Sequence, residues 1–315
     1  MGVTLEEFAR EVGPVEAGPV WVQGHQSRFR PWTDVRRVSA PAGIMSLRAD
    51  EMIVECGAGT PIDDVQSAAA EVGQYVNLPV RSSGSGTVGG ALAMGHNDLR
   101  RLGRGSIRDA VLRLRMVGHN GEVIVAGGST VKNVSGFDLC RLFVGSRGSL
   151  GFMGDVLLRT RPLPQYSAWF EVHVTAYSEL MSITKSLYRP AAVLWNGNTA
   201  IFCLEGHQAD VVATLAEVRI HTGFELQQRA APDLSDYPYR LSLPPSQIPG
   251  IVAQSTSQCW AEIGVGTIHF REVQPIKEMS PGISTITERL LTRFNPSGRL
   301  NPGQGPSDHH QPRLP

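Results

Sequence analysis

A glycine-rich run is the first feature of this sequence that could do chemistry. Residues 84–89 read Gly-Ser-Gly-Thr-Val-Gly, which is the spacing of the dinucleotide fingerprint G-x-G-x-x-G. That fingerprint follows a buried strand and opens a long crossover helix, but residues 77–82 contain a proline. One or two helical turns fit before Gly103, and a hairpin over residues 110–126 then follows where a parallel strand is needed. The context therefore argues against a Rossmann site.

The same run still suits an anion. Successive small residues let backbone N–H groups come close to a phosphate, and such concave backbone stretches bind phosphates. A pyrophosphate placed against residues 85–93 would find the hydroxyl groups of Ser85 and Thr87 as further donors. The alternative is a glycine-rich turn that only permits tight packing, and the run by itself favours that simpler interpretation.

Three further blocks accompany this run. Residues 128–139 read Gly-Ser-Thr-Val-Lys-Asn-Val-Ser-Gly-Phe-Asp-Leu, and residues 142–151 read Leu-Phe-Val-Gly-Ser-Arg-Gly-Ser-Leu-Gly. Residues 294–303 read Phe-Asn-Pro-Ser-Gly-Arg-Leu-Asn-Pro-Gly. In this order the four blocks resemble the FAD-binding oxidases of the vanillyl-alcohol-oxidase (PCMH) type and, within that family, the small FAD-binding subunit of bacterial glycolate oxidase. The resemblance is close over residues 18–165 and loose elsewhere.

The resemblance implies FAD contacts in three places: the loop after an N-terminal strand, the glycine-rich pyrophosphate loop, and the start of a later strand. The implied FAD-binding residues are Gly24, His25, Gln26, Ser27, Ser85, Gly86, Thr87, Val88, Gly89, Gly90, Gly151 and Phe152. His25 stands where the family has glycine. Some members attach FAD covalently through a histidine of this loop, and the matching position here is Gln26, so the resemblance implies noncovalent FAD.

Other parts of the blocks carry weaker implications. Lys132-Asn133 and Phe137-Asp138 match a family signature that braces the glycine loops, and Lys132 could alternatively lie near the flavin. Asn301-Pro302-Gly303 matches a C-terminal turn that approaches the flavin, or simply ends the chain. We expect Arg108 and Asp109 to form a local ion pair that fixes the loop before the next strand.

A complete 2-hydroxy-acid oxidase also needs an arginine for the substrate carboxylate and a base, often histidine, for the hydroxyl proton. The candidates in the second half of the chain are His173, His207, His221, His269 and Arg271. Helix ends account for His207 and His221, whereas the glycines of segment 264–269 would let a ligand approach His269. The sequence assigns no catalytic residue.

Composition excludes several classes of protein. Lys plus Arg and Asp plus Glu each number 29, and this balance argues against a nucleic-acid partner. No apolar run approaches the roughly 20 residues of a membrane-spanning helix, and the N-terminus lacks the pattern of a secretory signal. The four cysteines form no Cys-x-x-Cys pair, so we expect no metal site and four buried thiols. We expect a cytoplasmic protein, or one peripheral to the inner membrane through its partners.

The elements that must position these blocks follow from periodicity and turn residues. In the first half we predict irregular structure over 1–45 with a strand at 20–23, strands at 52–56, 110–117, 122–126 and 152–160, and a helix that Thr60-Pro61 begins. In the second half we predict strands at 168–174, 192–195, 200–204 and 224–227, helices at 178–187 and 209–221, irregular structure over 230–250, a strand pair at 260–265 and 267–270, and a helix at 283–294. Its apolar stripe is Ile283, Ile286, Leu290 and Phe294.

The predicted fold class is α+β. Residues 1–164 are expected to form a PCMH-type FAD-binding domain of two α+β subdomains. Residues 165–303 are expected to form a small ferredoxin-like domain, because their strands and helices alternate in the split βαβ order. This second domain would include the terminal helix and turn, and residues 304–315 would be a disordered tail.

The predicted function is that of an FAD-binding subunit in a glycolate-oxidase-like complex, which passes electrons through bound FAD. The resemblance implies two partners, a larger flavin subunit that carries the 2-hydroxy-acid site and an iron–sulfur subunit. The short second domain favours this interpretation. The alternatives are a standalone FAD-dependent oxidoreductase that acts on a small alcohol or hydroxy acid, and a noncatalytic scaffold subunit on a flavin fold, which the His25 departure motivates.

Overall fold

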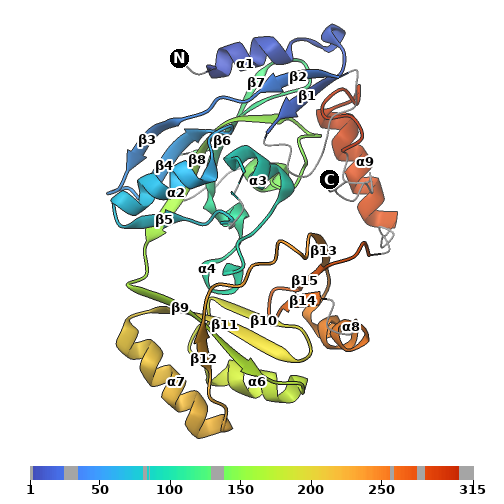
Figure 1. Ribbon diagram of the computed structural model, residues 1–315. Helices are drawn as coiled ribbons and strands as arrows, with labels where there is room; N and C mark the ends of the chain where they lie inside the picture. The colour runs from blue at the N-terminus through green and yellow to red at the C-terminus, as the bar shows by residue number, and fades with distance from the viewer. Residues whose placement is uncertain are drawn as a thin grey trace. The chain divides into compact units, whose positions relative to one another are not determined.

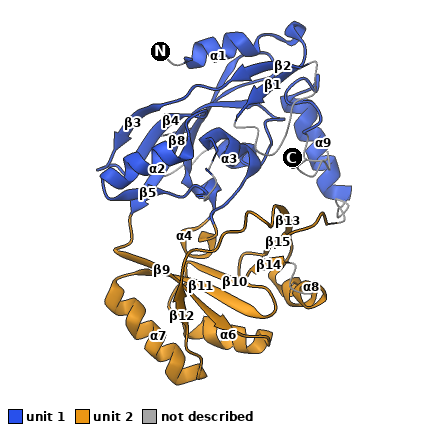
Figure 2. Ribbon diagram, viewed as in Figure 1, with its two compact units in different colours: residues 1–98, 106–162, 276–315 blue, residues 99–105, 163–275 orange. Residues whose placement is uncertain are grey.

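The structure is a computed structural model that describes residues 3–24, 35–80, 84, 86–128, 138–255, 259–274 and 281–304. The chain divides into two compact units, each with its own core (Figure 2). Unit 1 comprises residues 1–98, 106–162 and 276–315, and unit 2 comprises residues 99–105 and 163–275.

This division differs from the predicted domains at the C-terminal end. Residues 276–304 belong to unit 1, because Leu290, Leu291 and Phe294 pack against the unit 1 core. Gln304, which the sequence assigns to a disordered tail, is buried, and residues 305–315 lie outside the described residues. A core made by residues distant in sequence is what local periodicity does not reveal.

Unit 1 is built on an antiparallel sheet in the order β3-β4-β8-β6-β7, with β5 paired to the far end of β8 (Figure 1). Its strands are β3 (Ile44–Arg48), β4 (Ile53–Gly57), β5 (Gln74–Val76), β6 (Val111–Val117), β7 (Val123–Gly127) and β8 (Phe152–Pro162). The predicted hairpin at Asn120-Gly121 is confirmed as the connection from β6 to β7. A separate parallel pair joins β1 (Val20–Gln23) and β2 (Arg36–Ser39).

The first helix, α1 (Leu5–Val12), lies in a segment predicted to be irregular, so that prediction is wrong. Thr4 and Glu7 form a capping box: the Thr4 hydroxyl accepts from the Glu7 amide at 3.2 Å, and the Glu7 carboxylate accepts from the Thr4 amide at 2.8 Å. The Thr4 amide also lowers the pKa of Glu7. The helix buries its apolar side against Val117 and Phe152 of the sheet.

The other described helices of unit 1 range from single turns to one helix of 14 residues. They are α2 (Ile62–Glu71), α3 (Val88–Met94), α5 (Leu139–Phe143), α9 (Pro281–Phe294) and the single turns η1 (Val15–Ala17) and η2 (Ile107–Ala110). Thr60 does not cap α2 as predicted, because Pro61 occupies the N-cap. The Thr60 hydroxyl instead donates to the Gly57 carbonyl at 2.6 Å and accepts from the Gly43 amide at 2.9 Å.

Only part of the predicted stripe on α9 is buried. The Phe294 ring meets Phe143 edge-on at 5.5 Å between centroids, and Leu290 packs against the same core. Ile283 and Ile286 are 56% and 60% exposed, so the first half of the predicted apolar stripe does not pack into the core. The helix contacts its unit through its C-terminal turns, which lead directly into the Asn-Pro-Ser-Gly-Arg block.

Arg299 ties this C-terminal segment to the N-terminal one. Its side chain is 3% exposed, and its guanidinium donates to four backbone carbonyls at 2.7–3.0 Å. The acceptors are the carbonyl groups of Val12, Gly13, Gly18 and His119. Burial lowers the pKa of Arg299. The next residue, Leu300, bridges to Val20 in parallel, so the two ends of unit 1 form one layer.

Unit 2 confirms the predicted split βαβ order. Strands β9 (Tyr166–His173), β10 (Ala192–Trp195), β11 (Thr199–Gly206) and β12 (Gln227–Arg229) lie in the order β12-β9-β11-β10, with α6 (Tyr177–Ser186) and α7 (Gln208–Thr222) connecting them. The sheet continues through β14 (Cys259–Glu262), β15 (Thr267–Phe270) and β13 (Tyr239–Ser242).

Three elements of unit 2 lie wholly or partly in a segment that was predicted to be irregular. Residues 230–250 were expected to be irregular, yet they contain β13, the turn η3 (Pro245–Gln247) and the start of α8 (Ile248–Gln254). The prolines of this segment suggested irregular structure, but Pro249 occupies an early position of α8, where its missing N–H is harmless. Helix α4 (Arg101–Arg104) lies beside β10, where its Gly103 amide donates to the Ala191 carbonyl at 3.0 Å, and its Arg104 forms a bidentate ion pair with Glu205 at 2.5 and 3.0 Å.

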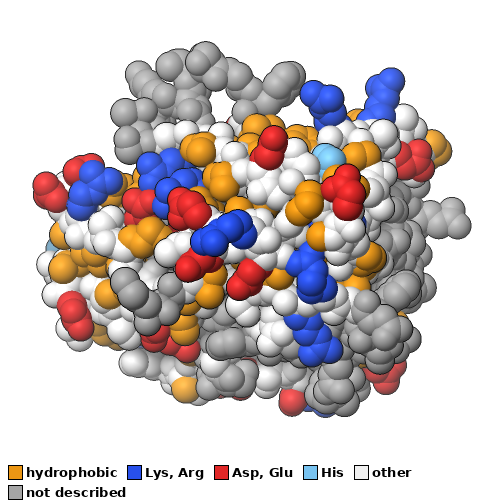
Figure 3. Space-filling view, turned by 90° about the horizontal axis from the view of Figure 1, so that it is seen from above, with side chains coloured by type: hydrophobic (Ala, Val, Ile, Leu, Met, Phe, Trp, Pro, Cys, Tyr) orange, Lys and Arg blue, Asp and Glu red, His pale blue; other side chains and the backbone are white. Residues whose placement is uncertain are grey.

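The cysteines are buried and the surface charges are of both signs, as expected from the sequence. All four cysteines are free and buried, as predicted, and burial raises the pKa of Cys56 and of Cys203 to about 12. Within the described ranges no cluster of metal-binding side chains occurs, and no helix is both long and apolar enough to cross a bilayer. Acidic and basic side chains lie interspersed on the face in Figure 3.

Candidate cofactor site

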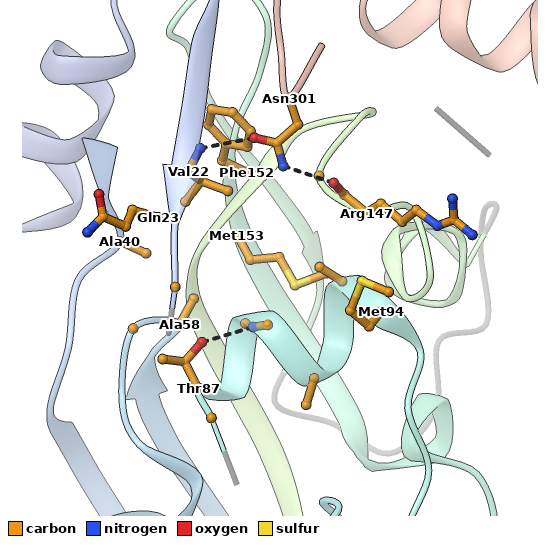
Figure 4. A pocket seen from close by; sticks show the side chains of 18 of the residues that line it. Val22, Gln23, Ala40, Ala58, Thr87, Met94, Arg147, Phe152, Met153 and Asn301 are labelled. Carbon is orange, nitrogen blue, oxygen red and sulfur yellow. Dashed lines mark hydrogen bonds between the residues drawn. The ribbon is translucent and has the colours of Figure 1, made fainter. Parts of the chain in front are cut away.

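A cavity of about 170 Å³ lies in unit 1, where segments distant in sequence meet. Its walls come from the end of β1, the turn at residues 58–59, helix α3 with its preceding loop, residues 147–153, and the C-terminal residues 301–304 (Figure 4). Three of the four glycine blocks in the sequence therefore contribute to one cavity.

The predicted FAD-binding residues fall into three groups. Those that line the cavity are Gly24, Gly86, Thr87, Gly89, Gly90, Gly151 and Phe152. Val88 is fully buried in the core beside them. His25, Gln26, Ser27 and Ser85 lie outside the described residues, as do Lys132, Asn133 and Phe137 of the second block.

The glycine-rich wall uses its backbone donors internally. The amides of residues 88–90 donate to the Thr60 carbonyl, the Ala58 carbonyl and the Thr87 hydroxyl, at 2.9, 2.7 and 3.1 Å. Each of these N–H groups already has an acceptor within the protein, so the contact of residues 88–90 with a pyrophosphate stays a prediction. Thr87 caps α3 by accepting, which leaves its own hydroxyl hydrogen for a ligand oxygen.

Close packing explains why this wall is built from glycine. A Cβ on Gly89 would lie 2.8 Å from the Cβ and 2.9 Å from the carbonyl oxygen of Ala58. A Cβ on Gly151 would lie 2.8 Å from the ring of Phe143. At these two positions the simpler alternative from the sequence, a turn that permits tight packing, accounts for the glycine.

Arg147 lies on a tight turn in the opposite wall. Its φ of 55° is left-handed, which is unusual for a residue other than glycine. The turn is held on both sides: the Arg147 amide donates to the Ala93 carbonyl at 2.8 Å, and the Arg147 carbonyl accepts from the Asn301 side-chain nitrogen at 2.9 Å. Strained backbone that is held in this way is common at binding sites.

Asn301 links two walls of the cavity. Its Oδ1 accepts from the Val22 amide at 3.0 Å while its Nδ2 donates to Arg147, as the dashed lines in Figure 4 show. Its φ of 43° is a conformation that asparagine tolerates better than most residues. A Cβ on Gly148 would lie 2.5 Å from the Asn301 side-chain nitrogen, so glycine is required there.

Sequence reasoning missed most of the apolar wall. Trp21, Val22, Met94 and Met153 line the cavity, and in Figure 4 the two methionines lie between Thr87 and Asn301. No motif marks these residues, because they become neighbours only through the fold.

The polar lining is basic or neutral. His96 and Arg147 line the cavity, and no acidic side chain does so among the described residues. Gln304 is 5% exposed, and its side-chain oxygen has no hydrogen-bond partner in the described part of the chain. An apolar slot with basic and uncharged polar groups suits a flat, anionic ligand.

The candidate catalytic residues all belong to unit 2 and do not form one cluster. His269 is buried, with its Nε2 2.7 Å from the Glu262 carboxylate. The nearby glycines are explained by packing, since a Cβ on Gly264 would lie 2.9 Å from Leu102 and one on Gly266 would overlap the Leu243 carbonyl. The expected approach of a ligand through these glycines is therefore not supported.

The other candidates have ordinary surface environments. His207 lies at the N-cap of α7 without capping it, and contacts Gln165 at 2.7 Å, whereas His221 contacts the Glu217 carbonyl in the last turn, as expected for a helix end. His173 ends β9 and is exposed, and the Arg271 guanidinium lies 5.0 Å from the centre of a tyrosine ring, Tyr237.

The predicted ion pair of Arg108 with Asp109 is also wrong. Asp109 pairs with Arg141 at 2.9 Å and completes a capping box with Ser106. Arg108 instead points toward the Val144 carbonyl at 3.4 Å. Asp138, from the predicted bracing signature, caps α5 by accepting from the Arg141 amide at 3.1 Å. Asp109 and Arg108 therefore interact with residues of the 138–144 segment rather than with each other.

Parts of this sequence are similar to known proteins. Residues 34–127 match the family described as FAD binding domain. Glycolate oxidase subunit GlcE of Escherichia coli (strain K12) is 30% identical over 203 residues, which cover 62% of this chain and 58% of the relative. D-lactate dehydrogenase of Archaeoglobus fulgidus is 35% identical over 118 residues, 38% of this chain and 26% of the relative. This chain therefore spans little more than half of the one relative and about a quarter of the other.

A solved structure agrees on the fold. Alkyldihydroxyacetonephosphate synthase superposes with a TM-score of 0.68 at 13% identity, and the match covers 95% of this chain and 75% of that chain. The Bermuda grass isoallergen BG60 superposes with a TM-score of 0.55 over 72% of this chain and 51% of that chain, at 15% identity. The predicted resemblance is confirmed: the chain contains an FAD-binding domain with the PCMH-type fold, and FAD is the cofactor that this domain indicates.

Proposed function

We propose that this PCMH-type flavoprotein is the FAD-binding subunit of a complex that oxidises a 2-hydroxy acid, as in glycolate oxidase. The observation that carries the proposal is the cavity in unit 1, which is lined by residues from three of the glycine blocks. The sequence likeness to subunit GlcE supports the same proposal. The relatives named glycolate oxidase subunit and D-lactate dehydrogenase support a hydroxy acid as the substrate of the whole assembly.

The residues of the cavity fit FAD in chemistry. Met94, Met153 and Trp21 offer an apolar slot for a flat ring, and Arg147 and His96 offer positive charge or donors for an anionic group. The Thr87 hydroxyl hydrogen would contact a phosphate oxygen. FAD, when bound, supplies the redox chemistry, and this chain supplies binding, orientation and exclusion of water.

The proposal also includes two partner subunits. The described residues place no cluster of acid, base and arginine in this cavity, and the candidate catalytic side chains of unit 2 are paired or exposed. A larger flavin subunit would therefore carry the hydroxy-acid site, and an iron–sulfur subunit would accept the electrons. We propose further that FAD is bound noncovalently, since Gln26 occupies the position of the attachment histidine.

An absorbance spectrum of the purified full chain, before and after acid precipitation, tests cofactor and linkage together. Flavin bands that move to the supernatant are the expected result. Bands that stay in the pellet would overturn noncovalent binding, and His25→Ala would then test that residue as the attachment point. Absence of flavin even after reconstitution with FAD would favour the scaffold alternative and overturn the proposed function.

A second experiment separates a subunit from a standalone enzyme. The reconstituted chain is mixed anaerobically with glycolate or D-lactate, and the flavin absorbance is followed. We expect no bleaching by the chain alone, and bleaching when the two co-expressed partner subunits are present. Rapid bleaching of the isolated chain by either acid would support the standalone oxidoreductase instead.

A further inference from the structure

One buried polar atom of the cavity has no role in holding the protein together. Gln304 lines the cavity and is 5% exposed, and its Oε1 has no hydrogen-bond partner in the described part of the chain. Buried amide oxygens in native proteins are almost always paired, because leaving one without a donor destabilises the fold. An unpaired acceptor on a cavity wall therefore marks a place where a ligand donates.

The backbone of Gln304 is held by the turn that precedes it. Its backbone amide donates to the Asn301 carbonyl at 3.1 Å, and Asn301 is itself held by hydrogen bonds to Val22 and Arg147. Further back, the guanidinium of Arg299 anchors the segment through four backbone carbonyls. A side chain carried by such a rigid support presents its oxygen in one place, which is the condition for a specific contact.

The acceptor suits a particular kind of donor. A glutamine oxygen accepts, and an aromatic ring N–H or amino group on the ligand would donate without offering a competing acceptor at the same atom. The apolar slot beside Trp21 and Met153 suits a flat heteroaromatic ring in the same cavity. FAD carries such donors on both of its ring systems, at flavin N3 and at the adenine amino group.

We propose that Gln304 is a positioning residue for FAD, which accepts a hydrogen bond from an N–H on the edge of one of the two ring systems. The proposal rests on the proposed FAD binding and adds a contact that fixes the ring in the slot. Discrimination between FAD and analogues that lack that N–H follows from it, because the unpaired buried oxygen would then remain without a donor.

The test is a set of binding titrations on the full-length apoprotein, followed by flavin fluorescence. The probes are FAD, FAD methylated at flavin N3, and FAD in which hypoxanthine replaces adenine. We expect the wild type to bind one of the two analogues about tenfold more weakly than FAD, which is about 1.4 kcal/mol. The analogue that loses affinity identifies the ring that donates.

Two variants make the assignment specific to this residue. Gln304→Met keeps the length of the side chain but has no comparable acceptor, so it is expected to bind FAD about tenfold more weakly and no longer to distinguish FAD from that analogue. Gln304→Glu keeps an acceptor and should retain the discrimination, which also covers the case in which Gln304→Met fails to fold. Gln208→Leu, on the exposed first turn of α7, is the matched control and should behave as the wild type.

Each outcome decides the proposal separately from the proposed function. If Gln304→Met binds FAD like the wild type, or if the wild type binds both analogues as tightly as FAD, the Gln304 contact is overturned while FAD binding stands. If the wild type takes up no FAD at all, the proposed function fails and the contact fails with it.

Discussion

The two walls of the cavity use their hydrogen-bonding groups in opposite ways. In the glycine-rich wall, the amides of residues 88–90 all bond to acceptors within the protein. In the C-terminal wall, Asn301 joins two segments while Gln304, three residues later, keeps a buried oxygen without a partner in the described part of the chain. In the glycine block the backbone N–H groups are used for close packing and the Thr87 hydroxyl hydrogen stays available, whereas the buried acceptor left open to a ligand comes from Gln304, which no motif marks.

The largest expected effect comes from removing the anchor of the C-terminal wall. Arg299→Met removes a donor from four buried or half-buried carbonyls, of which only that of Val12 keeps a second donor, Arg36, among the described residues, so we expect the free energy of unfolding to fall by about 4 kcal/mol. Urea unfolding measures this loss. Arg293→Met, an exposed arginine at the end of α9, is the matched control and should change stability by no more than about 0.5 kcal/mol. Equal behaviour of the two variants would show that the wall is not anchored in this way.

The glycine wall should respond to a single methyl group. Gly89→Ala places a Cβ against Ala58, so we expect a loss of about 2 kcal/mol in the free energy of unfolding and a loss of FAD uptake. Gly282→Ala, in α9 with open space around its Cβ position, should be neutral or slightly stabilising. A stable Gly89→Ala variant with normal FAD uptake would contradict the packing role given to this glycine.

Asn301 tests the link between the walls. Asn301→Ala removes the bonds to Val22 and Arg147, so we expect FAD affinity to fall by about 30-fold, since each hydrogen bond contributes about 1 kcal/mol. Asn301→Asp keeps the acceptor for Val22 but sets an oxygen against the Arg147 carbonyl, so it should not restore the affinity. Titration with FAD measures both variants. Asn198→Ala, on an exposed hairpin of unit 2, provides a control that should leave affinity unchanged.

The smallest effect concerns Cys56, which is fully buried in the core of unit 1. Burial raises the pKa of its thiol to about 12 from 9.0. Below pH 9 both the folded and the unfolded chain hold this proton, so the thiol makes stability independent of pH there. Between pH 9 and about 12 only the unfolded chain loses it, and the free energy of unfolding falls by about 1.4 kcal/mol per pH unit.

Comparison of the wild type with Cys56→Ala isolates the pH dependence of stability that comes from this thiol. The difference in their urea midpoints should be constant from pH 7 to pH 8 and should then shift against the wild type at pH 10. A difference that stays constant up to pH 10 would show that the thiol is not buried in the core.

Part of this arrangement could be predicted from the sequence because its causes are local. Asn120-Gly121 specifies a tight turn, and the alternation of strands and helices after residue 165 specifies the split βαβ order of unit 2. Helix α1 could also have been predicted from the sequence, because Thr4 and Glu7 have the three-residue spacing of a capping box.

The rest could not be predicted, because its causes are distant in sequence. The acceptors for the amides of residues 88–90 include carbonyls at residues 58 and 60, and the partner of Asp109 is Arg141 rather than its neighbour. Similarly, the glycines near His269 suggest access, while the structure fills the space beside them with Leu102 and Leu243. Residue types indicated the chemistry of the cofactor domain, but the fold decides which groups remain available.

The bond network of Arg299 also sets an order of events during synthesis. A ribosome releases the residues of β1 and α3 long before the segment 295–304 that completes their cavity. Until that segment emerges and returns to the N-terminal strand, the Val22 amide has no Asn301 side chain to bond and the cavity lacks one wall. A chain cut before residue 299 would keep the first three blocks but would lack Asn301 and Gln304, and with them the C-terminal wall of the cavity.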